Sequence, residues 1–453
     1  MCKKILLVSA NLLWDPYPVY PIGISYLATY LRKHLPSFEM LTWDINLHST
    51  EMLETLLDEK KPDYIGVSIR NIDGTNSLDR TSFIPDYERI ITLIKKRSNA
   101  PLILGGAGFS LYAELLFHRL QADYAIKGEG ETALTELITC LDSNSDYRNI
   151  EGLLYRDEGK LIMNPRRTFA SKLTVHYDDD LIDYYWKHSG MLNIQTKRGC
   201  YHKCIYCSYP LIEGRNVRIL NIDEIVDNIE YLQKEKNIDY IFFTDSLFNL
   251  DREKTMQLAE TIIRRNLKIR WAAYFSPSNL MDEEMALYKQ SGLTHIEFGS
   301  ESFSNIQLKN YGKSFTFDTV LKTSELALKH NVFYAHFLIL GGYGETEQTV
   351  NETFENSKLL RYTVMFPFVG MRIYPGTLLQ EYAIRDDIVS ADDTLLEPRY
   401  YISPDFDKAT LRERAHQTGK AWIFPGDIPE QEIQAFKLKR RKKGLIWEYL
   451  RKP

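Results

Sequence analysis

Short apolar runs alternate with amphipathic stretches along the first third of the chain. Residues 3–9 have the length and composition of a buried parallel strand, and residues 21–31 carry apolar side chains at helical spacing after Pro21. Four further runs predict strands at residues 39–43, 64–68, 102–104 and 124–126. Helical stretches lie between these runs. The alternation predicts an open parallel sheet with helices on both faces, which is a Rossmann-like (flavodoxin-like) α/β domain over residues 1–141.

A second series of the same kind begins at residue 191. Its strands are predicted at residues 192–196, 240–244, 269–273, 295–298, 333–339 and 365–373. Its helices are predicted at residues 223–236, 252–265, 282–291 and 316–331. Parallel strands joined by helices in this number predict a partial TIM-type (β/α)6 barrel over residues 191–385. Residues 142–190 are polar and predicted as a linker with a small hairpin and a solvated turn at 178–180, and residues 386–453 as a small C-terminal extension.

Composition narrows the class of protein. The length of 453 residues suggests two or three domains, and the net charge of −5 argues against a nucleic-acid binder. Neither a membrane span nor a signal peptide is predicted, because apolar runs stay short and the first residues read as a strand. Three of the five cysteines are clustered, so we expect a reducing, cytoplasmic setting. The basic run at 437–443 is predicted as a solvated helix face, with binding of an anionic partner as the alternative.

Three closely spaced cysteines are the strongest chemical signal in the chain. Cys200, Cys204 and Cys207 have the spacing C-x3-C-x2-C. A structural zinc site takes four ligands, and no second cysteine pair or histidine pair follows to complete one. Three thiolates suit a cubane iron–sulfur cluster that leaves one iron open for a ligand. The alternative is a loop that carries three reduced thiols.

Polar and glycine residues follow the predicted strands of the first domain. Ligands of such sheets bind beyond the carboxyl ends of the strands. The glycine loop at 105–108 follows a strand and opens a helix, so its backbone N–H groups are candidates to hold an anionic group, although glycine also serves any tight turn. The candidate ligand-binding residues at these ends are Asn11, Ser68, Arg70, Asn71, Gly105, Gly106, Gly108, Gly128 and Glu129.

The cysteine triplet, with Tyr206 before its last cysteine, resembles the signature of the radical S-adenosylmethionine (SAM) enzymes. Residues 21–27, 62–68, 105–108 and 128–132 resemble the cobalamin-binding domain that precedes the radical domain in one large subfamily. The resemblance implies that the cysteines hold a [4Fe-4S] cluster whose open iron chelates SAM, and that one electron cleaves SAM to a 5′-deoxyadenosyl radical. It also implies that the strand-end residues of the first domain bind cobalamin.

Further motifs of the second domain resemble the family's SAM-binding elements. Phe298–Ser302 resembles its Gly-x-Glu-Ser element, and Leu340–Thr346 resembles a Gly-x-Pro-Gly-Glu-Thr element with Tyr343 in place of proline. For Asp245, after the second strand, the alternative is a helix cap. The resemblance implies SAM contacts at Tyr206, Asp245, Glu301, Ser302, Gly341 and Gly342.

The cobalt ligand departs from the pattern of many cobalamin proteins. Their Asp-x-His-x-x-Gly sequence is absent, and His34 and His48 stand in the wrong context. We therefore expect cobalt without a histidine ligand from that motif, with Arg70 or Asn71 facing its lower side. One alternative places Arg70 in a surface ion pair, and another is a domain that has kept the fold and lost the cofactor.

The resemblance implies an enzyme that methylates an unactivated carbon, or less often phosphorus, of a small metabolite, lipid or natural-product intermediate. Methylcobalamin would deliver the methyl group, and an external one-electron reductant of the flavodoxin or ferredoxin type would supply electrons. A related cyclisation, ring contraction or oxidation without methyl transfer is the first alternative. A cobalamin- or redox-sensing binding protein is an alternative of another class. The catalytic residues, the substrate and the oligomeric state have no signal in the sequence.

Overall fold

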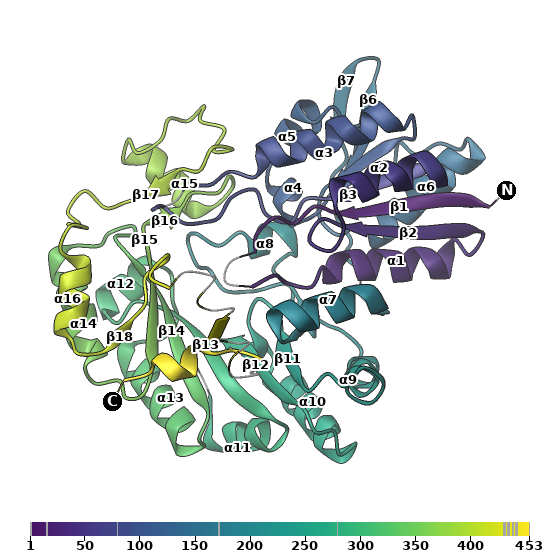
Figure 1. Ribbon diagram of the computed structural model, residues 1–453. Helices are drawn as coiled ribbons and strands as arrows, with labels where there is room; N and C mark the ends of the chain where they lie inside the picture. The colour runs from purple at the N-terminus through teal and green to yellow at the C-terminus, as the bar shows by residue number, and fades with distance from the viewer. Residues whose placement is uncertain are drawn as a thin grey trace.

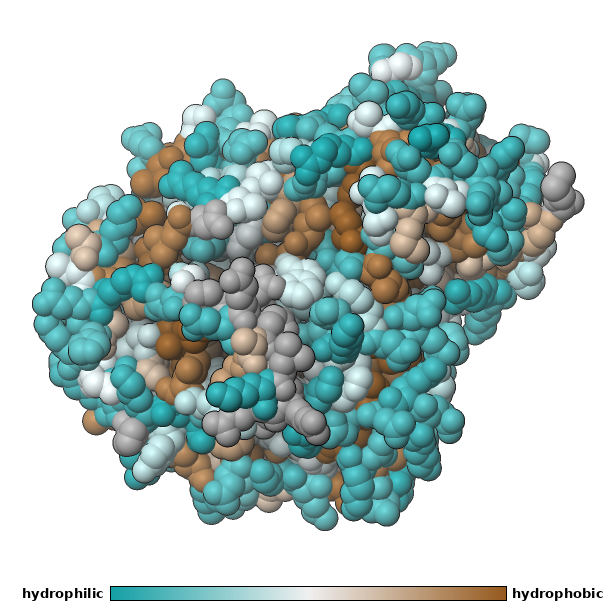
Figure 2. Space-filling view, in the orientation of Figure 1, coloured by the Kyte–Doolittle hydropathy of each residue, from teal (hydrophilic) through white to brown (hydrophobic). Residues whose placement is uncertain are grey.

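The computed structural model has two seven-stranded sheets among its described residues, each covered by helices (Figure 1). It describes residues 2–14, 17–78, 80–170, 173–278, 280–428 and 443–452, with residues 432, 435, 436 and 439. Most of the basic run at 437–443 therefore lies outside the described residues. Figure 2 shows hydrophilic residues over the outer helices and hydrophobic ones at the boundary between the two halves. No helix in the described part of the chain is long and apolar enough to cross a bilayer.

The first sheet has the strand order β2-β1-β3-β4-β5-β6-β7, parallel as far as β5 and antiparallel beyond it. The order 2-1-3-4-5 is that of flavodoxin-like sheets, which confirms the predicted fold class. The hairpin predicted in the linker forms and pairs with β5, so it extends this sheet. The strands are β1 (Lys3–Ser9), β2 (Phe38–Asp44), β3 (Tyr64–Ser68), β4 (Leu102–Gly105), β5 (Tyr124–Ile126), β6 (Leu153–Asp157) and β7 (Lys160–Met163).

Helices cover both faces of this sheet because its strands are apolar on both sides. One face packs on α1 (Ile22–His34) and α6 (Glu131–Ser143) through residues such as Leu31 and Leu137. The other face packs on four helices through residues such as Leu57 and Ile91. These helices are α2 (Thr50–Lys60), α3 (Ile84–Arg97), α4 (Ala107–Leu111) and α5 (Ala113–Arg119).

The second sheet is entirely parallel, in the order β18-β15-β14-β13-β12-β11-β8. The six strands predicted for this half are confirmed. Strand β18, from the predicted C-terminal extension, adds a seventh. Helices cover its outer face, and the sheet curves as half of a barrel (Figure 1). The strands are β8 (Leu192–Ile194), β11 (Tyr240–Phe243), β12 (Arg270–Phe275), β13 (Leu293–Glu301), β14 (Phe333–Leu340), β15 (Val364–Val369) and β18 (Ala421–Trp422). The helices are α9 (Ile222–Lys236), α10 (Arg252–Arg264), α11 (Asp282–Gln290), α13 (Phe317–Lys329) and α14 (Glu347–Ser357).

Shorter elements connect the two halves and close the half-barrel. Asp178 accepts hydrogen bonds from Asp180 and Leu181 N–H and begins a helix, so the prediction of a solvated turn there is wrong. The tail from Lys443 onward packs on the inner face of the sheet through Leu445 and Trp447. These elements are α7 (Asp179–Ser189), β9 (Lys197–Arg198), α8 (Tyr209–Ile212), β10 (Arg218–Ile219), η1 (Phe248–Leu250), α12 (Asn305–Asn310), β16 (Met371–Arg372), α15 (Leu378–Arg385), β17 (Tyr400–Tyr401), α16 (Leu411–Gln417) and η2 (Trp447–Leu450).

Candidate active site

A cavity of about 430 Å³ lies at the carboxyl end of the first sheet, where the two halves meet. Its walls include α1, the ends of β1 and β3, the loop between β4 and α4, and α8 of the second half. The nine candidate ligand-binding residues all line this cavity, as expected if ligands bind beyond the carboxyl ends of parallel strands. They are Asn11, Ser68, Arg70, Asn71, Gly105, Gly106, Gly108, Gly128 and Glu129. Their contact with cobalamin stays a prediction, but the fold brings them to one space.

Two glycines of the β4–α4 loop are required by close packing. A Cβ on Gly106, whose φ is +104°, would lie 2.5 Å from the carbonyl oxygen of Ile69. A Cβ on Gly108 would lie 2.8 Å from the carbonyl oxygen of Arg70. The Gly108 N–H donates to the Ile69 carbonyl at 3.0 Å. The glycines therefore seat this loop against the end of β3 and shape one wall of the cavity.

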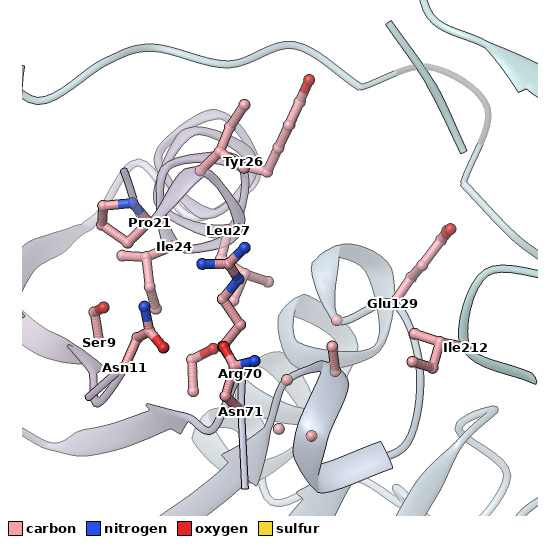
Figure 3. Close-up of a pocket in the computed structure, with 18 of the residues that line it drawn as sticks. Ser9, Asn11, Pro21, Ile24, Tyr26, Leu27, Arg70, Asn71, Glu129 and Ile212 are labelled. Carbon is pink, nitrogen blue, oxygen red and sulfur yellow. The ribbon is translucent and has the colours of Figure 1, made fainter. Parts of the chain in front are cut away.

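Unpaired amide atoms face the cavity and fit a ligand rich in hydrogen-bonding groups. Asn11 is buried, and neither its Nδ2 nor its Oδ1 has a partner; Asn71 Oδ1 is buried and unpaired as well. Figure 3 shows Asn11, Arg70 and Asn71 around the same space. Buried polar atoms of this kind are costly unless a ligand or water pairs with them. The peripheral amides of a corrin ring provide both donors and acceptors, so the residues present fit cobalamin.

Arg70 projects from the end of β3 across the cavity toward Leu27 (Figure 3). The structure shows no ion pair or hydrogen bond of its guanidinium among the described residues, so the surface ion pair given as an alternative does not form among them. The two histidines are engaged elsewhere: His48 Nδ1 accepts from the Asp44 N–H at 3.1 Å, and His34 stacks on Tyr30. Neither histidine lines the cavity. Among the described residues that line the cavity, Arg70 thus has a guanidinium without an ion-pair partner, whereas Arg198 pairs with Glu131.

The three cysteines occupy the loop between β9 and α8. Cys200 is buried and Cys204 and Cys207 are half-buried. Burial, followed by the neighbouring Cys204, raises the pKa of Cys207 to about 12, and burial raises the pKa of Cys200. Thiolates in such a setting need a bound cation as countercharge, which a cluster provides.

Backbone contacts from the second sheet hold the cysteine loop. Ile205 N–H donates to the Tyr311 carbonyl at 3.3 Å, and the Ile205 carbonyl accepts from Leu379 N–H at 2.9 Å. A Cβ on Gly312 would lie 2.5 Å from the carbonyl oxygen of Lys203. The turn after α12 and the start of α15 therefore fix the loop at the carboxyl ends of the strands.

Tyr206, Glu301 and Lys313 form a hydrogen-bonded cluster beside the cysteines. The Tyr206 hydroxyl donates to Glu301 Oε1 at 2.8 Å, and Lys313 Nζ lies 3.2 Å from the same oxygen. Glu301 has a φ of +64°, a strained conformation for a non-glycine residue that is enriched at functional sites. Although burial opposes it, the charges of Glu301 and Cys204 leave the pKa of Lys313 raised. Tyr206 and Glu301 were candidates from the sequence, and their contact with SAM stays a prediction; Lys313, which carries no motif of its own, was missed.

The carboxylate of Asp245 has partners within the chain, and its contact with SAM stays a prediction. Its carboxylate is fully buried and pairs with Lys197 Nζ at 2.7 Å. It also accepts from the Thr196 N–H at 2.7 Å, so its oxygens have partners in the segment that follows β8. The alternative of a helix cap is wrong, because Asp251 caps α10. Asp245 fixes Thr196 and Lys197, and so the start of β9, which precedes the cysteine loop.

Ser302 and the glycine pair also have structural partners. Ser302 is fully buried and its hydroxyl lies 3.1 Å from Thr353 Oγ1, and its contact with SAM stays a prediction. A Cβ on Gly341 would lie 2.5 Å from Phe406, and a Cβ on Gly342 would lie 2.4 Å from Tyr311 Oη. Packing thus explains both glycines, and their contact with SAM stays a prediction.

A buried ion network that sequence reasoning missed joins the two halves. Arg198 Nη2 lies 2.8 Å from Glu131 Oε1, and Arg218 Nη2 lies 2.5 Å from Glu129 Oε1. Burial opposes ionisation, yet the two carboxylates keep the pKa of Arg198 raised and Arg198 keeps the pKa of Glu131 lowered. Glu129 lines the cavity, but its carboxylate is committed to Arg218. The signal available in the sequence was the opposite charge of the two segments, acidic at Glu129 and Glu131 and basic at Arg198 and Arg218.

Comparison with known proteins decides the family. The model of the B12 binding domain matches residues 11–138, and that of the radical SAM superfamily matches residues 194–356. The chain is a cobalamin-dependent radical SAM enzyme. Its cofactors are therefore a [4Fe-4S] cluster, SAM and cobalamin, as expected from the sequence.

Relatives of this family match most of the chain. An uncharacterized methyltransferase, PH0819 of Pyrococcus horikoshii, is 25% identical, with 95% of this chain and 94% of the relative covered. The anaerobic magnesium-protoporphyrin IX monomethyl ester cyclase of Rubrivivax gelatinosus is 23% identical over 75% of this chain and 62% of its own. The solved structure of the radical SAM methyltransferase TsrM from Kitasatospora setae, with cobalamin and a [4Fe-4S] cluster bound, has a TM-score of 0.88 at 22% identity and covers 99% of this chain and 97% of its own. This last likeness confirms the fold.

Proposed function

We propose that this enzyme methylates an unactivated carbon of a small metabolite, lipid or natural-product intermediate. The observation that carries the proposal is the shared cavity. Arg70, at the end of β3, and Ser208 and Tyr209, directly after the last cysteine, line the same space. Bound SAM would supply the methyl group and the radical chemistry, and bound cobalamin would carry the methyl group to the substrate.

The residues of the chain would divide the work between the two cofactors. Cys200, Cys204 and Cys207 would hold the cluster. Arg70 would face the lower side of the corrin, with Asn11 and Asn71 donating to and accepting from its peripheral amides. Binding of this kind orients the reacting groups and keeps water away from them.

Methyl transfer is favoured over other radical reactions because two methyltransferases, PH0819 and TsrM, match along nearly the whole chain. A cyclisation, ring contraction or oxidation without methyl transfer is the second candidate, favoured by the similarity to the Rubrivivax cyclase. An external one-electron reductant of the flavodoxin or ferredoxin type would serve either reaction. The reduced thiols that the cluster needs support a cytoplasmic location.

Tracing the methyl group separates the two candidates. The holoenzyme, prepared without oxygen, is incubated with methyl-labelled SAM and a reductant, and the extracted cobalamin is analysed by mass spectrometry. Label in the cobalamin is the expected result. Bound but unlabelled cobalamin would rule out methyl transfer and leave the second candidate. Protein reconstituted with the cluster alone is the control for non-specific labelling.

A further inference from the structure

Exposed side chains stand directly beside the cysteines that would hold the cluster. Tyr201, next to the buried Cys200, is 51% exposed, and Lys203, next to Cys204, is exposed as well. Electron transfer between proteins becomes steeply slower as the distance between their redox centres grows. A donor that touches Tyr201 and Lys203 is one residue away from a cluster ligand, so this surface suits the entry of an electron.

Two further exposed cations lie beside the same loop. Arg215 is exposed, and its Nη1 donates to the His202 carbonyl oxygen at 3.3 Å, so it lies against the residue before Lys203. Lys309 is exposed near the end of α12, and the turn that follows packs on the cysteine loop. A Cβ on Gly312 in this turn would lie 2.5 Å from the Lys203 carbonyl oxygen. Three cations from separate segments therefore gather around one loop.

Neighbouring acids do not neutralise these cations. None of the three has an ion-pair partner among the described residues. Residues 199–216 and 305–314, which carry them, contain a single acid, Glu213, whose carboxylate accepts from the Gly199 N–H at 2.9 Å. Because the whole chain has a net charge of −5, the positive charge here is a local reversal of sign. Such a patch attracts an acidic protein and speeds its approach.

Exposed apolar side chains accompany the charges. The Tyr201 hydroxyl donates to the Leu250 carbonyl oxygen at 3.2 Å, which holds the exposed ring in place. Ile306, which is also 51% exposed, lies three residues before Lys309 on the same face of α12. Asp251, whose charge acts on Tyr201, is engaged as the cap of α10. The surface thus combines apolar contacts with unpaired cations, as a site for a charged protein partner requires.

We propose that Lys203, Arg215 and Lys309, together with Tyr201, form the docking surface for an acidic flavodoxin-type electron carrier. The negative charge of the carrier complements the three cations, and the exposed apolar edge of its flavin packs on the Tyr201 ring. One electron passes from the reduced flavin, which is oxidised, to the cluster, which is reduced, and no proton is transferred. This inference rests on the proposed function, because it names the partner that supplies electrons to the same cluster.

The test measures the binding of a fluorescently labelled, acidic bacterial flavodoxin to the reconstituted holoenzyme by fluorescence anisotropy at low ionic strength. The variant carries Lys203→Gln, Arg215→Gln and Lys309→Gln together. We expect its dissociation constant to be about tenfold higher than that of the unmodified holoenzyme. The affinity of the unmodified holoenzyme should fall as salt is added, because salt screens exposed charges.

A matched control removes the same charge elsewhere. Lys33, Lys96 and Lys160 are exposed, lie in the first half and have no ion-pair partner among the described residues. Their joint replacement by glutamine should change the dissociation constant by less than about twofold, because only charges at the docking surface act on the bound carrier. Iron and cobalt contents equal to those of the unmodified holoenzyme establish that both variants are folded.

A second measurement follows the reduction of the cluster by electron paramagnetic resonance after rapid freezing. The reduced flavodoxin should reduce the cluster of the docking-surface variant about tenfold more slowly than that of the unmodified holoenzyme. The methyl viologen radical, a small cation that needs no docking surface, should reduce the variant at least as fast. Equal slowing with both reductants would show that the substitutions act on the cluster itself and would overturn the inference.

Three other results would also overturn it. They are an unchanged flavodoxin affinity in the docking-surface variant, an equal loss in the control variant, and binding of a ferredoxin or a labelled oligonucleotide where the flavodoxin does not bind. Labelling of cobalamin by SAM with a chemical reductant needs no carrier. Failure of that labelling with docking intact would therefore refute the methyl-transfer function alone, and the reverse result would refute the docking surface alone.

Discussion

The two halves of the active site differ in how much of their polarity is already used. On the cobalamin side, Asn11 and Asn71 have unpaired buried amide atoms and Arg70 lacks a partner among the described residues. On the radical side, Asp245 and Ser302 are satisfied by neighbours within the same half of the chain. The first half has a cavity whose unpaired polar atoms can bind a large polar ligand, and we call its wall around Asn11, Arg70 and Gly106 the cradle. In the second half, the buried pair of Asp245 and Lys197 supports the cysteine loop, and we call this pair the brace. Position at a strand end therefore indicates a ligand contact only where the side chain has no partner inside the fold.

The largest expected effect comes from breaking the brace. Asp245→Ala should leave Lys197 buried without its partner and lower the free energy of unfolding by about 3–5 kcal/mol, since an uncompensated buried charge is strongly destabilising. Urea unfolding followed by circular dichroism measures the change. Asp239→Ala, which removes the exposed partner of Arg270, is the control and should change stability by less than about 1 kcal/mol. A loss no larger than that of the control would show that the brace is unimportant.

Buried Glu297 is the exception on the radical side, because it has a single hydrogen-bond donor, Trp447 Nε1, among the described residues. Its ionisation predicts a pH dependence. Its pKa is about 7 in the folded protein, raised by burial, against an ordinary value of 4.5. The group therefore contributes stability that is fully present below pH 4.5 and is lost as the pH rises to about 7. Relative to Glu297→Gln, the native protein should lose on the order of 3 kcal/mol over this interval and stay constant above it. Unfolding at several pH values measures this, and a difference that does not vary with pH would contradict it.

The cradle depends on the backbone, so a single methyl group should damage it. Gly106→Ala places a Cβ against the Ile69 carbonyl at a positive φ and should destabilise the protein by about 2 kcal/mol. Cobalamin binding should fall with it, because the loop can no longer seat against β3. Gly74→Ala is the matched control, since a Cβ there meets nothing within 4 Å. Unchanged cobalamin affinity in Gly106→Ala would show that this loop does not shape the site.

The smallest effect on stability should accompany a clear effect on binding. Asn11→Leu removes two unpaired amide atoms from the cavity wall, so the unfolding free energy should stay within about 1 kcal/mol or rise. Affinity for hydroxocobalamin should fall roughly tenfold through the loss of hydrogen bonds. Titration followed by the cobalamin absorption spectrum measures the affinity. If Asn11→Leu lowered the unfolding free energy but left the cobalamin affinity unchanged, Asn11 would serve the fold rather than the ligand, which would contradict the contrast drawn between the two halves.

Much of the fold was predictable because each strand is a short apolar run and each helix has an amphipathic face. The cavity-lining residues were also predictable, since parallel strands bring Asn11, Ser68 and Gly105 to one edge. What the sequence did not reveal were pairings across long separations. Lys313 reaches Glu301, Trp447 reaches Glu297 and Arg198 reaches Glu131 through contacts that no local pattern encodes. The partners that Asp245 and Ser302 have within the fold were not visible in the sequence for the same reason.

The most direct test of a shared two-cofactor site is the metal content of the reconstituted chain. The protein is purified without oxygen, supplied with iron, sulfide and hydroxocobalamin, and analysed for iron and cobalt beside Cys200→Ala. We predict about four irons and one cobalt per chain, with iron lost and cobalt kept in the variant. Iron without cobalt in the unmodified protein would contradict the account, because the cradle at the end of the first sheet would then be empty scaffold.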